Sequence, residues 1–209
     1  MLTDDRSLPL LPADLPTLDW VVGHGTATTS QAGGRLEITA AAGTDWTNDA
    51  LGGPAQHAAA LLGFEAPGRF ALSARAGVAS APRTTFDAAA LAIWGDQDHW
   101  AKICFEYSPQ GEAMVVSVVT NVWSDDCNST VVADSHVHLR VSRVSDRAWA
   151  FHSSSDGHRW DFVRLFRLEW DGPLQVGFLA QAPQGDTCVA TFDAIAFSAD
   201  PPADLRDSS

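Results

Sequence analysis

A lysine and a glutamate stand four residues apart in one short, largely apolar run, WAKICFEY at residues 100–107. Successive side chains of a strand point to opposite faces of its sheet, so Trp100, Lys102 and Glu106 share one face. Polar groups beside an aromatic ring can orient and stack on a sugar or another ring-shaped ligand. We therefore predict a ligand-binding groove on this face, with Glu106 as its candidate catalytic group.

The preceding run, residues 86–94, predicts a strand that pairs antiparallel with this one. Its large aliphatic side chains belong to the core, so Leu91 should face Ile103 across the pair. This register sets Trp94 opposite Trp100 at one end of the groove. It also leaves a row of alanines as the floor of the groove, with room above for a ligand.

The following run, MVVSVVTN, predicts a third strand of the same sheet. The pairing of Phe105 with Val116 places Ser117, Val119 and Asn121 on the groove face. An open face of this kind is typical of antiparallel sheets. The alternative is that another layer of the same chain covers the face, because alanine is also a common buried residue.

Loops rich in turn residues provide the expected rim of the groove. Residues 43–54 (GTDWTNDALGGP) contain Trp46, and residues 122–134 (VWSDDCNSTVVAD) contain Asp125 and lead into a short strand at Thr130–Ala133. The predicted ligand-binding residues are Trp94, Trp100, Lys102, Glu106, Asn121, Asp125, Trp46 and His57.

The whole chain reads as about a dozen short strands separated by turn signals, without a convincing amphipathic helix. This pattern predicts an all-β protein, a two-sheet antiparallel sandwich of the jelly-roll type. We expect an extended N-terminal arm over residues 1–18, one domain over residues 19–199, and a frayed tail over residues 200–209.

Composition excludes several classes of partner. A formal net charge of −13 and a pI near 4.6 argue against binding to nucleic acid or to an anionic membrane. We find no secretory signal at the start and no run long enough to span a bilayer. Three cysteines without metal-ligand spacing are typical of reduced thiols, so we expect a cytoplasmic protein without a cofactor; the oligomeric state stays open.

Two groups of residues have ligand types that could bind a metal. Asp96, Asp98 and His99 share one turn, and His136, His138 and His152 occupy outward strand positions. The turn lacks the ligand count of a calcium loop, and histidines at outward strand positions are usually surface residues. We therefore predict no metal site.

Four segments together resemble a known family. They are TDWTND at 44–49, residues 90–126, residues 138–160 with the turn Ser155-Asp156-Gly157, and residues 174–198. The sequence resembles the concanavalin A-like family of uncharacterised proteins called "regulation of enolase protein 1"-like, whose trp-x-lys-x-x-x-glu motif falls on Trp100, Lys102 and Glu106. The resemblance implies a concanavalin A-like lectin/glucanase sandwich, without an established activity.

Three functions compete. The first is binding of a carbohydrate or similar small molecule on the groove face. The second is a carbohydrate-active hydrolase or lyase on that face, but the glucanase pattern glu-x-asp-x-x-glu is missing, so a second acid must come from a loop, such as Asp125 or Asp49. The third is a regulatory protein-interaction module of carbohydrate metabolism.

Overall fold

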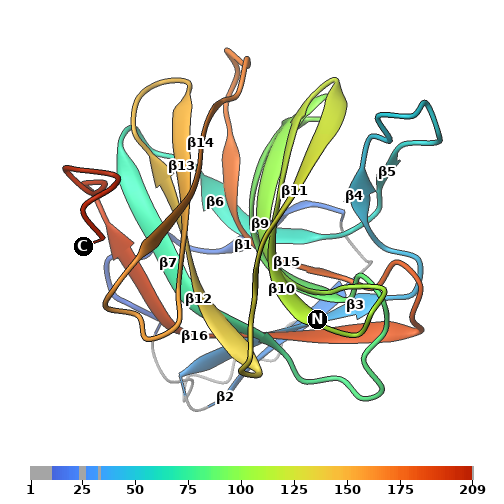
Figure 1. Ribbon diagram of the computed structural model, residues 1–209. Coiled ribbons are helices and arrows are strands. Elements are labelled where there is room, and N and C mark those ends of the chain that lie inside the picture. Colours follow the sequence, from blue (N-terminus) through green and yellow to red (C-terminus); the bar gives the residue numbers. More distant parts are fainter. Residues whose placement is uncertain (1–10, 24–26, 33, 209) are drawn as a thin grey trace.

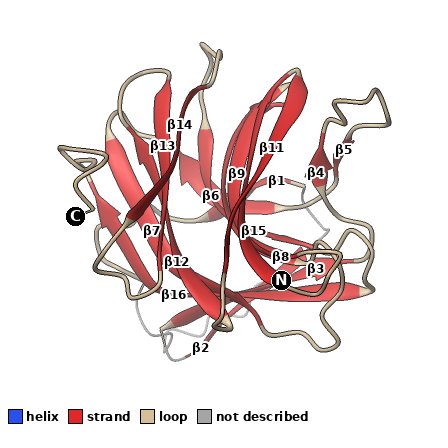
Figure 2. Cartoon of the chain, in the orientation of Figure 1, coloured by secondary structure: helices blue, strands red, loops and turns tan. Residues whose placement is uncertain are grey.

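The computed structural model describes residues 11–23, 27–32 and 34–208, and this part of the chain consists of strands and loops without a helix (Figures 1 and 2). Two seven-stranded antiparallel sheets face each other. Sheet A runs in the order β1 (Asp19–Val22), β6 (Leu61–Glu65), β15 (Gln175–Gln181), β8 (Ala88–Asp96), β9 (His99–Tyr107), β10 (Ala113–Asn121) and β11 (Trp123–Val131). Sheet B runs in the order β14 (Asp161–Arg167), β13 (Ala148–Ser154), β12 (His136–Arg143), β7 (Phe70–Val78), β16 (Thr187–Ser198), β3 (Arg35–Ala41) and β2 (Ala27–Ala32). A short pair, β4 (Trp46–Thr47) and β5 (Gln56–His57), lies outside both sheets.

The core lies between the two sheets. Alternate residues of β7, such as Leu72 and Ala74, are fully buried and meet the buried face of β8 and β9, which carries Leu91, Ile103 and Phe105. Large aliphatic and aromatic side chains at every second position therefore drive the layering. The all-β, jelly-roll sandwich predicted from the sequence is confirmed.

The strand pairing around β9 differs from expectation on one side only. Between β8 and β9 the predicted register is confirmed, with Leu91 opposite Ile103 and Trp94 opposite Trp100. Between β9 and β10 the prediction is wrong by one residue, because Phe105 pairs with Val115.

A slip of one residue moves every side chain of a strand to the other face. Val118 therefore stands beside Lys102 on the outer face of sheet A, and the positions expected there, Ser117 and Val119, belong to the opposite face. The run MVVSVVTN is apolar on both faces, so alternation could not fix its register. The turn does, through the hydrogen bonds from Gly111 N to Ser108 O and from Ser108 N to Glu112 O.

The alanine floor is not open. Residues 42–60, which include β4 and β5, pass over the outer face of sheet A, and Trp46 packs there with Ala88, Ala90 and Ala92 in one buried cluster (Figure 1). None of these alanines is exposed. Their small side chains make room for the Trp46 ring rather than for a ligand, so the groove expected at this end of the face is covered by the chain itself.

Both ends of the described chain pack against the sandwich. Leu15 and Leu18 of the N-terminal segment contact the core cluster, while residues 1–10 of the expected arm lie outside the described residues. At the other end, His152 Nε2 lies 2.9 Å from Leu205 O, and Trp160 N donates to Ser208 O at 3.1 Å. The expectation of a frayed tail is therefore wrong for residues 200–208, which these hydrogen bonds hold on the outer face of sheet B.

A search for a membrane span finds no helix of sufficient length and hydropathy among the described residues.

Candidate functional site

A cavity of about 250 Å³ remains open on the outer face of sheet A, where residues 42–60 leave β9, β10 and β11 uncovered. Its walls are carboxylates, amides and apolar side chains. The lining residues are Asp45, Trp46, Thr47, Phe86, Lys102, Glu106, Val116, Val118, Asp126, Asn128 and Gln181.

Lys102 forms the base of this cavity and is almost entirely buried. Its Nζ donates to Gln181 Oε1 at 2.7 Å, to Trp46 O at 2.9 Å and to Asp45 Oδ1 at 3.0 Å. Burial acts to lower the pKa of Lys102, but the surrounding acidic groups, Asp45 first and Glu106 with it, together outweigh burial, and the pKa lies above its ordinary value. An ammonium group has three N–H bonds, so all of them are used within the protein. Lys102 therefore fastens residues 45 and 46 to the sheet and has no donor left for a ligand.

Glu106 stands four residues further along β9, on the same face. Gln181 Nε2 lies 3.4 Å from Glu106 Oε2 and donates to Phe86 O at 3.0 Å. Burial raises the pKa of Glu106 from 4.5 to about 7, and the charge of Lys102 only partly opposes this. Near neutral pH this carboxyl group is therefore present in both forms and can donate as well as accept a hydrogen bond.

Two residues of β11 complete the cavity, and neither was predicted. Val118 pairs with Asp126 and Val116 pairs with Asn128, so both side chains share the face of Lys102. Burial raises the pKa of Asp126 above its ordinary value, and the charge of Lys102 opposes the rise. The segment was interpreted as a loop because β11 is a polar edge strand. Alternation carried over from the observed register of β10 places Asp126 in the site, whereas the register predicted from the sequence would have placed Asp125 there.

Asn121 and Asp125, both predicted to contact the ligand, lie on the other face of sheet A. Asn121 Nδ2 donates to Arg167 O at 3.2 Å, and Asn121 Oδ1 accepts from Glu169 N at 3.0 Å. The carboxylate of Asp125 lies 2.8 Å from Arg164 Nη2. These contacts link β10 and β11 to the β14 edge of sheet B, so these two predictions are wrong for this cavity.

The predicted aromatic residues form a cluster beneath residues 42–60. The rings of Trp46 and Trp94 lie 4.6 Å apart, and those of Trp46 and Trp100 lie 5.8 Å apart. Trp46 and Trp100 expose 1% and 0% of their surface, so neither ring can stack on a ligand. Trp94 is half-buried against Trp46 and His57.

His57 and Asn48 fasten the same segment at its far end. His57 Nε2 lies 2.7 Å from Asn48 Oδ1, and Asn48 Nδ2 donates to Gln97 O and Val122 O, each at 2.9 Å. Burial lowers the pKa of His57, which favours the neutral ring. The structure thus gives His57 a positioning contact rather than a place in the cavity lining.

The two groups considered for metal binding make other contacts. Asp96 Oδ1 lies 2.7 Å from His99 Nδ1 and accepts from Asp98 N at 2.9 Å, which closes the turn. Across the described residues, no group of three or more His, Cys, Asp or Glu side chains is placed to hold a metal ion.

The fold is that of a concanavalin A-like, two-sheet jelly-roll β-sandwich, and solved structures of a lectin-like domain and of a GH43 protein share it. The chain resembles the legume lectin-like domain from Entamoeba histolytica, with a TM-score of 0.53 and 9% identity over 85% of this chain and 89% of that one. It also resembles part of the GH43 protein BlXynB from Bacillus licheniformis, with a TM-score of 0.60 and 13% identity over 79% of this chain and 33% of that one.

Residues 23–200 match the family described as protein of unknown function (DUF1349), and the chain belongs to this family. It is 29% identical over 165 residues to "Regulation of enolase protein 1" from Saccharomyces cerevisiae, which covers 78% of this chain and 80% of that protein. It is also similar to the crystal structure of a functionally unknown protein from Saccharomyces cerevisiae, with a TM-score of 0.77 and 25% identity over 88% of this chain and 97% of that one.

Proposed function

We propose that the chain binds a saccharide-like ligand in the cavity above β9, β10 and β11. One observation carries this proposal: Glu106, Asp126 and Asn128 converge from two strands on a cavity with an apolar wall. Carboxylates and amides pair with hydroxyl groups, while Val116 and Val118 can contact the C–H face of a sugar ring. The likeness to a lectin-like domain supports the proposal at the level of the fold alone.

The charge of the cavity favours a neutral sugar. The Lys102 ammonium is paired with Asp45, so the remaining charged groups in the lining are Glu106 and Asp126. Both are carboxyl groups, and in a partly buried site they repel an anionic ligand. Neutral hexoses, pentoses and their oligomers are therefore expected to bind more tightly than uronic acids of the same ring size.

A thermal-shift screen with neutral and acidic mono- and oligosaccharides tests this proposal. A ligand at about one hundred times its dissociation constant stabilises the folded protein by about 2.7 kcal/mol, a shift of several degrees for a domain of this size. In Asp126→Asn the shift should fall to about half or less, because a ligand that binds tenfold more weakly stabilises by only about 1.4 kcal/mol at the same concentration. If no neutral sugar shifts the melting temperature, or if acidic sugars shift it most, the proposal is wrong.

A carbohydrate-active hydrolase or lyase on the same face is the second candidate. The observation that favours it is Glu106, whose pKa of about 7 suits a general acid or base at neutral pH, with a second carboxyl group, Asp126, in the same cavity. The partner acids considered from the sequence fit less well: Asp125 faces away, and Asp49 Oδ1 accepts from Leu51 N within its own turn.

Turnover is the measurement for this candidate. Any sugar that binds is incubated with the protein, and products are quantified for the native chain and for Glu106→Gln. We expect the variant to lose turnover by about 10²-fold or more while it still binds the sugar, because only proton transfer is removed. Equal turnover in both proteins would discard Glu106 as the catalytic group.

A regulatory protein-interaction module is the third candidate. The name of the yeast relative points to regulation in that protein, and in this chain Val122 and Trp123 at the tip of the β10–β11 hairpin expose about half of their surface. We also propose a cytoplasmic location, because Cys104, Cys127 and Cys188 are free thiols. A negative sugar screen would direct the search to protein partners of this hairpin.

A further inference from the structure

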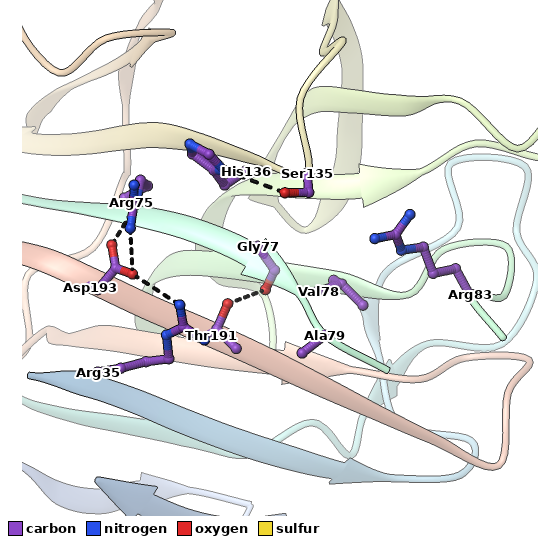
Figure 3. Close-up of a pocket in the computed structure, with 10 residues that line it drawn as sticks. All are labelled: Arg35, Arg75, Gly77, Val78, Ala79, Arg83, Ser135, His136, Thr191 and Asp193. Carbon is purple, nitrogen blue, oxygen red and sulfur yellow. Dashed lines mark hydrogen bonds and ion pairs between the residues drawn. The ribbon is translucent and has the colours of Figure 1, made fainter. Parts of the chain in front are cut away.

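A second cavity, of about 220 Å³, lies at one end of the outer face of sheet B (Figure 3). Three of its ten lining residues are arginines, Arg35, Arg75 and Arg83, and the only carboxylate among them is Asp193. The chain as a whole has 26 acidic and 13 basic residues. The local charge is therefore opposite in sign to that of the protein, and it differs from the carboxylate-rich cavity on sheet A.

One end of the cavity holds two guanidinium groups around one carboxylate. Arg75 Nε and Nη2 donate to the two oxygens of Asp193 at 2.6 and 2.8 Å, and Arg35 Nη2 lies 3.6 Å from Asp193 Oδ2. A bulge in β16 directly after Asp193, with Ala194 at a φ of 46°, interrupts the pairing with β7. Two positive charges against one negative charge leave this end of the lining with a net charge of +1, and among the described residues the 3.6 Å contact with Asp193 is the ion pair that Arg35 forms.

The other end holds Arg83 (Figure 3). Its guanidinium lies 5.1 Å from the centre of the Tyr107 ring, and it forms no ion pair with a carboxylate of the described residues. Within the lining of this cavity, this end therefore contributes one positive charge, while Glu112 and Asp134 line an adjacent cavity that Arg83 also borders. Between the two ends, the backbone of Gly77, Val78 and Ala79 forms the floor.

Gly77 keeps this floor open. A Cβ at this position would lie 2.8 Å from Ser135 O and 3.3 Å from Thr191 Oγ1, so any side chain would collide with the neighbouring strands. A volume of about 220 Å³ corresponds to roughly seven water molecules at about 30 Å³ each. The space is sufficient for a ligand of a few heavy atoms.

We propose that this cavity binds a small dianion whose two negative groups are separated, the chemistry of a short dicarboxylate. One carboxylate meets Arg35 and Arg75, and the other meets Arg83. Guanidinium forks pair with planar carboxylates through two parallel hydrogen bonds, which gives both strength and orientation. The +1 charge of each end matches one carboxylate at each end. A long polyanion is not expected, because the net charge of −13 repels it beyond the cavity.

Titration calorimetry with succinate and butyrate at constant ionic strength tests the proposal. The two ligands have the same number of carbons, but only succinate has two carboxylates. We expect succinate to bind at least about tenfold more tightly than butyrate, since a charge-assisted hydrogen-bonded pair is added. Arg35→Gln and Arg83→Gln should each weaken succinate binding to the level of butyrate.

Arg159→Gln is the matched control, because it removes one positive charge from an exposed arginine outside this cavity, and it should leave succinate binding unchanged. Arg35 and Arg83 are largely solvent-exposed, so their variants should melt at the native temperature without ligand. Equal binding of succinate and butyrate, or no binding of either, would overturn the proposal. Binding that is lost in Arg35→Gln but kept in Arg83→Gln would overturn its two-ended form.

Discussion

Glu106 combines burial with a titratable group, so its protonation is coupled to folding. Its pKa in the folded protein is about 7, against 4.5 for the ordinary side chain. Between these two pH values the folded state binds more protons than the unfolded state, so this group makes the free energy of unfolding fall as the pH rises from about 4.5 to about 7. The stabilisation that it provides is complete below the unfolded pKa and is lost above the folded one.

The variant Glu106→Gln should remove this dependence. Native protein and variant are compared by urea unfolding at pH 5 and at pH 7.5, so that all other titrating groups cancel in the difference. We expect the variant to gain stability relative to the native protein at the higher pH. A difference between the two proteins that stays constant with pH would show that Glu106 has an ordinary pKa.

The face of the strand on which Lys102 lies could be predicted from the sequence, but its structural role could not. Alternation placed it on the correct face, opposite Ala92. Its partners Asp45, Trp46 and Gln181 lie 57, 56 and 79 residues away, and no local pattern reveals that they use all three of its N–H bonds. The chemistry of an isolated lysine therefore pointed to a ligand, whereas the assembled chain gives it a structural role.

At the scale of elements, residues 42–60 decide which part of the outer face of sheet A is open. The Lys102 ammonium and the buried Trp46 ring hold this segment on β9. Replacement of Lys102 by methionine leaves Asp45 unpaired with its carboxylate only 17% exposed. Removal of one partner of such a pair costs about 3–5 kcal/mol.

Urea unfolding of Lys102→Met measures this cost. The control is Arg147→Met, which breaks solvent-exposed ion pairs with Glu169 and Asp171 and should lose much less stability, because such pairs are screened by water. If both variants lose the same small amount of stability, Lys102 does not fasten the segment, and the covering of the alanine floor has another cause.

The register of a strand could be predicted from the sequence where its two faces carry different types of residue. In β8, Leu91 and Ile93 alternate with alanines, and the predicted register with β9 is confirmed. In β10, valines stand on both faces, so the register came out wrong. In β11, polar side chains stand on both faces because it is an edge strand, and the strand was taken for a loop.

At the scale of the whole molecule, the two sheets present two cavities of opposite character. Sheet A carries carboxylates and amides around Lys102, and sheet B carries arginines around Asp193. The sandwich itself could be predicted from strand spacing and turn residues. Of the lining of the sheet A cavity, Trp46, Lys102 and Glu106 could be predicted. The other lining residues and the sheet B cavity could not, because each cavity brings together side chains from at least three strands or loops that are distant in the sequence.

We propose that a neutral sugar binds on the face of β11 that carries Asp126. Asp125 and Asp126 are neighbours of identical chemistry that point to opposite faces, so they form a matched pair. Titration calorimetry measures the dissociation constant of a sugar found in the screen for Asp125→Asn and Asp126→Asn. We predict native affinity for Asp125→Asn and a loss of about tenfold or more for Asp126→Asn, as expected when a hydrogen bond to a charged group is weakened. Equal affinity of the two variants would contradict the claim.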